Sequence, residues 1–247
     1  METSERIAAL SDIGLRRKNN EDAAYAVSQQ YGTLLVIADG MGGHRKGEVA
    51  SKIVVDSLSI RFNSERKVFN ARRSKKFYKK QMKKANQEIY KMSLSGDEYR
   101  EMGTTAVSCV IGEKETMVFS VGDSRCYVLD TEGNLKQVTK DQTYVELLFE
   151  SGKITKAEMA DHPQKNLLVN AVGINPDLTN CEEFILENTS YHSILLCSDG
   201  LYNMVSDEEI RKTMSSTLTA PEKAKELIKK ALDNGGNDNV AVAIWDN

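Results

Sequence analysis

The stretch LLVIADG, residues 34–40, places an acid directly after five apolar residues. A short apolar run that is rich in branched side chains and ends at Asp-Gly predicts a buried β-strand that stops at a turn. Because the strand is buried, Asp39 should lie at the rim of the hydrophobic core. Other segments repeat this arrangement, and the repetition guides both the fold assignment and the search for a functional site.

Three further acids stand beside apolar segments in the same way. They are Asp123 after residues 118–122, Asp199 after residues 194–198, and Asp238 two residues before the run 240–245. Asp-Gly is also a common turn signal, so each acid taken alone is explained more simply by a turn. Together they support a second hypothesis, in which the strand ends converge and bring several carboxylates into one small volume.

Convergence of this kind would require a compensating cation. Two like charges about 4 Å apart repel by about 4 kcal/mol at an effective dielectric constant near 20. Carboxylate oxygens, with the backbone carbonyl of Gly40, are hard ligands that suit Mg²⁺ or Mn²⁺. Zinc is disfavoured because the sequence has no Cys-x-x-Cys pair and its three histidines are far apart, at His44, His162 and His192.

The composition is that of a globular protein with a slight excess of acid. The 247 residues are 40% hydrophobic, and 33 Lys and Arg against 36 Asp and Glu give a net charge of −3. This balance argues against a globally basic nucleic-acid-binding protein. No apolar run approaches the roughly 20 residues of a membrane span, and no secretory signal is readable. We therefore expect one cytoplasmic domain over residues 1–247, with reduced cysteines at Cys109, Cys126, Cys181 and Cys197.

Short β-like runs and helical segments do not alternate strictly along the chain. The β-like runs are residues 6–12, 23–28, 33–39, 104–111, 116–121, 126–130, 181–186, 193–198 and 239–245. Helical spacing covers residues 49–60 and 75–93, and four later segments open with capping boxes at Thr143, Thr155, Ser206 and Thr219. This order disfavours a doubly wound parallel sheet. It predicts an α+β protein with mainly antiparallel sheets flanked by α-helices.

Eleven cations crowd residues 61–84, where Glu65 is the only acid. One hypothesis is a surface for acidic partners, nucleic acid or anionic lipid. The simpler hypothesis is the exposed face of a helix whose apolar stripe packs on a sheet; the stripe is Tyr78, Met82, Ala85 and Ile89. No aromatic residues are arranged to stack on bases, so we favour the structural explanation and expect no nucleic-acid partner.

The segment SDIGLRRKNNED, residues 11–22, places three consecutive cations near two acids. These residues could form a solvated ion pair, or an Arg could hold a phosphate through two parallel hydrogen bonds. The pattern Ser-Asp-x-Gly-x-x-Arg-x-x-Asn-Glu-Asp resembles the first motif of the metal-dependent protein phosphatases, the type 2C serine/threonine phosphatase family. DGMGGH at residues 39–44 resembles the second motif in its bacterial form. The later motifs follow in order at residues 103–105, 121–125, 198–201 and 238–240.

The resemblance covers about residues 10–245 and is greatest for small stand-alone bacterial phosphatases that oppose transmembrane Ser/Thr kinases. It implies a sandwich of two antiparallel β-sheets flanked by α-helices, with a metal cleft at one end. A flap of about residues 150–172 should lie beside that cleft. By resemblance, Asp39 bridges two Mn²⁺ or Mg²⁺ ions, the carbonyl of Gly40 is a further ligand, and Asp199 and Asp238 hold one ion.

The remaining site residues are also implied by the resemblance. Glu21 would hold the other ion largely through water, and Asp22 would orient that water. Asp123 would share a third, weaker ion, although it could instead pair with Arg125 and close a turn. Arg17 would bind the phosphate of the substrate.

The implied reaction is direct hydrolysis of phosphoserine and phosphothreonine by a hydroxide bridging two cations, without a phospho-enzyme. Eukaryotic members carry a histidine directly after the second-motif Asp-Gly as a candidate general acid. Met41 stands there in this chain, so the proton should come from His44 or from a water on the third ion. His44 could equally cap the helix that follows. Asn170 stands where relatives often carry Arg, which argues against an Arg-based peptide contact at that position.

We therefore expect a protein-serine/threonine phosphatase that acts on phosphoproteins, opposes a cognate Ser/Thr kinase and works as a monomer. A catalytically inactive phosphatase-like binding module is the first alternative. It should have lost one or more metal acids, yet all of them are present. A metal-dependent phosphodiesterase is the second alternative. The acidic charge balance and the missing base-stacking pattern count against it.

Overall fold

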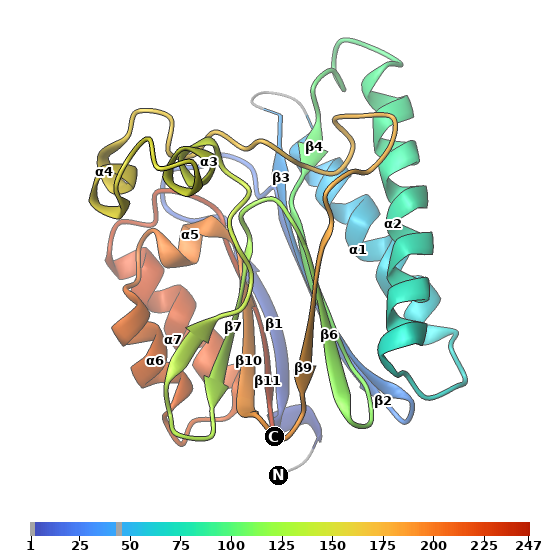
Figure 1. Ribbon diagram of the computed structural model, residues 1–247, viewed down its shortest axis with the longest axis vertical. Helices are drawn as coiled ribbons and strands as arrows, with labels where there is room; N and C mark the ends of the chain where they lie inside the picture. Colours follow the sequence, from blue (N-terminus) through green and yellow to red (C-terminus); the bar gives the residue numbers. More distant parts are fainter. Residues whose placement is uncertain (1–2, 43–45) are drawn as a thin grey trace.

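Two β-sheets lie face to face in the centre of the molecule, and helices cover the outer side of each sheet (Figure 1). The structure is a computed structural model that describes residues 3–42 and 46–247. One sheet has the strand order β1-β11-β10-β7-β8, and the other has the order β2-β3-β5-β6-β9, with β4 paired to β3. All paired strands that the structure describes run antiparallel. The predicted α+β sandwich is thus confirmed.

The strands follow the expected apolar runs closely. They are β1 (Ile7–Asp12), β2 (Asp22–Gln29), β3 (Gly32–Met41), β4 (Gly103–Thr104), β5 (Ala106–Ile111), β6 (Glu115–Val121), β7 (Arg125–Asp130), β8 (Leu135–Gln137), β9 (Glu182–Glu187), β10 (Tyr191–Cys197) and β11 (Val240–Asp246). The run expected over residues 104–111 is divided between β4 and β5. The division falls at Thr105, whose backbone N–H donates to the carbonyl of Asp39 at 2.9 Å.

Most of the helices connect two strands of the same sheet, and α3 and α4 connect strands of different sheets. They are η1 (Thr3–Glu5), α1 (Gly47–Asn63), α2 (Ala71–Ser93), α3 (Tyr144–Glu150), α4 (Lys156–Asp161), α5 (Asp199–Tyr202), α6 (Asp207–Met214) and α7 (Ala220–Asp233). Helix α2 begins four residues before its expected start because the side chain of Asn70 caps it by accepting from the Arg73 N–H. Capping boxes form at Thr155, Ser206 and Thr219, as expected. The short helix α5 was not expected.

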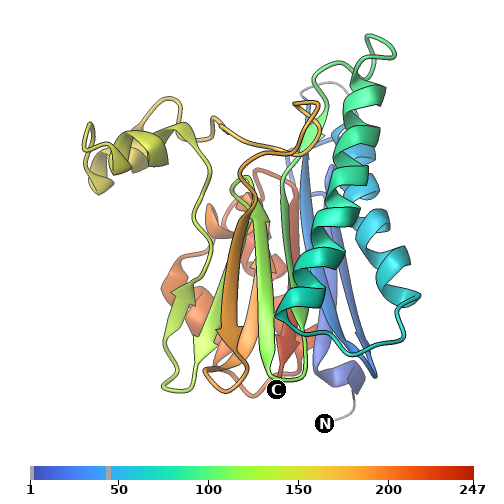
Figure 2. The same ribbon diagram turned by 45° about the vertical axis from the view of Figure 1, so that its right-hand side comes forward.

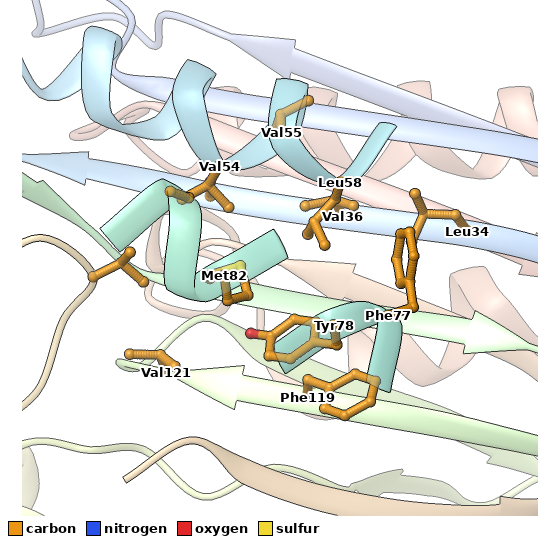
Figure 3. Close-up of a cluster of buried hydrophobic side chains, with 14 of the residues drawn as sticks. Leu34, Val36, Val54, Val55, Leu58, Phe77, Tyr78, Met82, Phe119 and Val121 are labelled. Atoms are coloured by element: carbon orange, nitrogen blue, oxygen red, sulfur yellow. The ribbon is translucent and has the colours of Figure 1, made fainter. Parts of the chain in front are cut away.

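Strand β3 is apolar without alternation because both of its faces are covered. Leu34 and Val36 pack under α1 and α2, whereas Leu35 and Ile37 face the opposite sheet. The helix-facing layer is drawn in Figure 3, where the ring of Tyr78 stacks on that of Phe119 with centroids 4.0 Å apart. The expected apolar stripe of α2 is buried against this sheet.

The other sheet is covered by α5, α6 and α7, which pack through side chains such as Ile210 and Leu227. Helices α3 and α4 stand away from the sandwich, near the end at which β3 stops (Figure 2). All four cysteines are free. Within residues 3–42 and 46–247, no helix combines the length and apolarity needed to cross a membrane.

Candidate active site

The predicted acids meet at one end of the sandwich, around a cavity of about 470 Å³. The cavity is lined by Arg17, Glu21, Asp39, Gly40, Met41, Gly42, Thr105, Asp123, Asn166, Leu167, Leu168, Asp199, Asp238 and Asn239. Every site residue named from the sequence lines it except Asp22 and His44. His44 lies outside the described residues. The hypothesis of converging strand ends therefore describes the structure better than a set of separate turns.

Both sheets contribute to the cavity. Asp39 and Gly40 are near the end of β3, and Asp123 follows β6 in the same sheet. Asp199 begins the helix that follows β10, and Asp238 precedes β11 in the facing sheet. The strands fix the positions of these acids, because each side chain lies within two residues of a hydrogen-bonded, buried segment.

Asp22 lies behind the cavity rather than on its wall. It is the cross-strand partner of Asp39 in the β2–β3 pair and is 8% exposed. The hydroxyl of Ser198 donates to Asp22 Oδ2 at 2.6 Å, and Ser198 Oγ accepts from the backbone N–H of Ala241 at 2.9 Å. Burial raises the pKa of Asp22 to about 7, although the Ser198 hydrogen bond acts in the opposite direction.

Asp39 occupies the centre of the acid group. Its carboxyl is in hydrogen-bonding contact with those of Asp22 and Asp199. Burial, followed by repulsion from Asp22, Asp199, Asp123 and Asp238, raises the pKa of Asp39 well above its usual range. Burial likewise raises the pKa of Asp123 to about 7 and that of Asp199 to about 6, with further contributions from neighbouring carboxylates. Protons rather than charges therefore accumulate here when no cation is present.

Two of the acids, Asp238 and Glu21, interact with residues outside the group of carboxylates around Asp39. Arg17 Nη2 donates to Asp238 Oδ2 at 2.6 Å, so the cation of the β1–β2 loop is joined to the segment before β11. Glu21 accepts a hydrogen bond from the backbone N–H of Gly47, at the start of α1. Burial and then repulsion from Glu48 raise the pKa of Glu21.

The donor set of the cavity suits a hard divalent cation. It consists of carboxylates with raised pKa values and a backbone carbonyl, and oxygen ligands of this kind bind Mg²⁺ and Mn²⁺. As placed, no three His, Cys, Asp or Glu side chains in the described part of the chain form a complete ligand group. The partners of Asp238 and Glu21 account for part of this, because both carboxylates point to other donors. A cation would replace these contacts and relieve the repulsion around Asp39.

The alternative role of Asp123 is not supported. Arg125 forms a two-pronged ion pair with Asp141, with Nη2 2.7 Å from Oδ2, and its guanidinium stacks over the Tyr202 ring. Asn170, near the end of the segment expected to form the flap, is buried and donates to the carbonyls of Thr179 and Asn180 and to Gln142 Oε1. Asn170 thus anchors the chain rather than facing the cavity.

Asn239 holds the loop that carries Arg17, a role that the sequence analysis did not assign to it. It is 4% exposed, and its amide donates to the carbonyls of Ile13 and Asn19 at 2.8 and 2.9 Å. Its Oδ1 accepts from the backbone N–H of Glu21 at 2.8 Å. These three bonds fasten both ends of the loop that carries Arg17. The signal available in the sequence was its place in the motif at residues 238–240, directly after a candidate metal acid.

The pH dependence of stability tests the electrostatics of the acid group. In EDTA, the free energy of unfolding should fall as pH rises from about 5 to about 7. Because the folded pKa values of Asp22 and Asp123 are near 7, above the ordinary 3.8, the folded chain binds more protons in this window. Their stabilisation is complete below the unfolded pKa and is lost as pH passes the folded pKa. Urea denaturation at each pH measures the slope, which Asp39→Asn should flatten; a rising stability would contradict the assignment.

The role of Asn239 can be tested without any functional assay. Asn239→Ala leaves two carbonyls and one N–H without their partner and should cost about 1–3 kcal/mol of unfolding free energy. Hydrogen exchange of the Glu21 amide should accelerate more than that of the core strands. Asn188→Ala is the matched control, because Asn188 makes similar amide bonds to Gly112 and Thr116 at a distant turn. Equal Glu21 exchange in both variants would show that Asn239 does not fasten the loop.

Known proteins resemble this chain in sequence over most of its length. The protein phosphatase 2C family model matches residues 16–234. The serine/threonine phosphatase stp of Listeria monocytogenes is 34% identical over 235 residues, covering 95% of this chain and 92% of its own length. Protein phosphatase PhpP of Streptococcus pneumoniae is 33% identical over 243 residues, which cover 96% of each chain.

Solved structures extend the likeness to three dimensions. The crystal structure of Stp1 from Staphylococcus aureus has a TM-score of 0.90 at 35% identity and covers 98% of this chain and 94% of that one. The catalytic domain of the phosphatase PstP in complex with two manganese ions has a TM-score of 0.82 at 35% identity, with coverage of 98% and 97%. The family match, the sequence identity and the shared fold show that the chain belongs to the protein phosphatase 2C family of serine/threonine phosphatases.

Proposed function

We propose that this phosphatase hydrolyses phosphoserine and phosphothreonine in proteins with two Mn²⁺ or Mg²⁺ ions in the acid-lined cavity. The observation that carries the proposal is the convergence of ionisable acids from both sheets on one cavity that also contains Arg17. The two manganese ions of the PstP catalytic domain provide support from a relative. When bound, such ions lower the pKa of a water molecule and polarise phosphoryl oxygens.

The chain would hold the ions through residues at the strand ends. We assign Asp39, the Gly40 carbonyl, Asp199 and Asp238 to direct contacts with the two principal ions. Glu21 and Asp22 would act through water, since Glu21 is directed towards Gly47 and Asp22 lies behind Asp39.

We assign Asp123 to a third, weaker ion. Its place on the cavity wall and its raised pKa are the supporting observations. With Arg125 paired to Asp141, the Asp123 carboxylate remains available to the cavity.

Arg17 would bind the substrate phosphate. Its side chain is 47% exposed, and it uses Nη2 towards Asp238. The rest of the guanidinium edge can therefore donate to phosphoryl oxygens while the ion pair fixes its orientation. Met41, on the cavity wall, has no proton to give to the leaving serine oxygen. We propose His44 or a water molecule for that step.

The flap side of the cavity would receive the peptide. Asn166, Leu167 and Leu168 line it, and Leu167 is 49% exposed, so an apolar contact beside the phosphoserine is available. The names of the relatives support phosphoprotein substrates. We further propose that the protein acts in the cytoplasm, as a monomer, in opposition to a Ser/Thr kinase.

Metal dependence is the direct test of this proposal. Hydrolysis of a phosphoserine peptide should stop in EDTA and return with Mn²⁺, and Asp39→Asn should lower kcat by about 10²–10⁴-fold. Calorimetric titration with Mn²⁺ should show weaker binding by this variant. Asp233→Asn, an exposed acid at the end of α7, is the control and should behave as wild type. Bis-para-nitrophenyl phosphate should be a poor substrate; preferred hydrolysis of this diester, or full turnover in EDTA, would contradict the proposal.

The phosphate contact of Arg17 can be tested by a change that keeps its charge. Arg17→Lys loses the planar fork and should lower kcat/KM on a phosphopeptide by about 10- to 100-fold, mainly through KM. Inhibition by inorganic phosphate should weaken in parallel. Arg16→Lys is the matched control, since Arg16 is the preceding residue and does not line the cavity. Equal effects of the two changes would assign the phosphate to another group.

A further inference from the structure

A second concave site lies in the helical layer, between α1 and α2. It is a hollow of about 280 Å³ lined by Arg61, Glu65, Arg73, Lys76, Phe77, Lys80 and Gln81. Helix α1 separates it from the acid-lined cavity. The first residue of α1, Gly47, touches Glu21, whereas Arg61 lies near the other end, about 20 Å further along the helix axis. Figure 1 shows the two helices on the outer side of their sheet.

Cations dominate the wall of this hollow. Arg61 Nη2 lies 2.6 Å from Glu65 Oε1, and Arg73 Nη2 contacts the other oxygen of the same carboxylate. Lys76 and Lys80 are exposed and one helical turn apart, and neither forms an ion pair within residues 3–42 and 46–247. Four cations against one acid leave a net charge of +3 around a small volume.

The two arginines are held in place rather than free in solvent. Glu65 is 7% exposed and accepts from both of them. Arg61 Nη1 also donates to Ser64 Oγ at 3.1 Å, and the Arg73 guanidinium lies over the Phe69 ring, 5.4 Å from its centroid. Such anchoring lowers the entropic cost of presenting both guanidinium groups to a ligand.

One buried donor in the lining of the hollow has no partner. Arg73 Nε is buried and makes no hydrogen bond to the residues that the structure describes. The Gln81 side chain also forms no hydrogen bond to these residues, but its amide remains in contact with solvent in the hollow. Buried polar side-chain atoms nearly always have hydrogen-bond partners. A ligand with several acceptor oxygens would accept hydrogen bonds from Gln81, the arginines and the lysines at once.

We propose that this hollow binds a phosphoryl group, either as free inorganic phosphate or as a phosphorylated side chain. A phosphate dianion matches an excess of positive charge and accepts several hydrogen bonds at once, whereas a carboxylate has one charge and two oxygens. The guanidinium forks of Arg61 and Arg73 suit tetrahedral oxyanions. The small volume of the hollow, about 280 Å³, favours a single phosphoryl group over a nucleic-acid strand.

Nuclear magnetic resonance can detect this site directly. In EDTA, where the catalytic site cannot turn over, titration with inorganic phosphate should shift the Gln81 side-chain amide signals saturably. Lys76→Gln/Lys80→Gln should weaken that binding at least tenfold and leave hydrolysis of para-nitrophenyl phosphate unchanged. Lys83→Gln/Lys91→Gln is the matched control, because it removes the same charge from exposed positions of α2 outside the hollow.

Two further measurements test where phosphate binds and whether the ligand is free phosphate or a phosphorylated side chain. Arg17→Ala removes the proposed phosphate contact of the catalytic cavity and should leave the Gln81 response intact. A phosphoserine hexapeptide that binds at least tenfold more tightly than inorganic phosphate would identify a protein-bound ligand, and equal binding would identify free phosphate; both results support the site. Three results would overturn it: loss of the response in Arg17→Ala, equal weakening in both double variants, or an equal affinity for acetate.

Discussion

Mutual repulsion among carboxylates at the ends of two facing sheets is the constraint on which the rest of the structure depends. Asp39 lies beside Asp22 and Asp199, and burial adds to the cost of charging any of them. Isolated acids on mobile loops would separate and become hydrated. Here they cannot, because each is attached to a strand whose neighbours are packed on both faces. The three hydrophobic layers therefore hold the acids at close range.

The end of β3 shows how closely the backbone supports this arrangement. The N–H of Asp39 donates to Thr105 Oγ1, and its carbonyl accepts from the Thr104 hydroxyl. A side chain at Gly40 would place its Cβ 2.2 Å from the carbonyl oxygen of Gly47 and 2.7 Å from that of Glu21. Glycine is required there because β3, the β1–β2 loop and the start of α1 meet at one point. The acids at the end of β3 and the helix that borders them are thus built on the same junction.

The sequence predicts those features that local pattern encodes. An apolar run that ends in an acid marks a strand end, so Asp39 and Asp199 could be placed at strand ends before the structure. The order of strands and helices predicted antiparallel sheets with flanking helices, and the two-sheet sandwich was implied by the resemblance to the phosphatase family. Contacts between segments that are distant in the sequence could not be predicted in this way. Asn239 bonds the Glu21 N–H across 218 positions, and Ser198 bonds Asp22 across 176. No periodicity or spacing links such residues, because their distance is set by the packing of one sheet on the other.

The positions of the charged residues explain their roles better than the net charge of the protein does. The net value of −3 suggests a nearly neutral surface, yet the fold gathers acids at the strand ends and places on the outer side of α2 two lysines that form no ion pair with the described residues. Even within α2 the cations differ. Lys75 and Lys79 turn to Glu183 of β9 and stabilise helix–sheet packing, whereas Lys76 and Lys80, one position further round the helix, border the hollow beside Gln81. A rotation of 100° per residue therefore separates structural cations from those free to bind an anion.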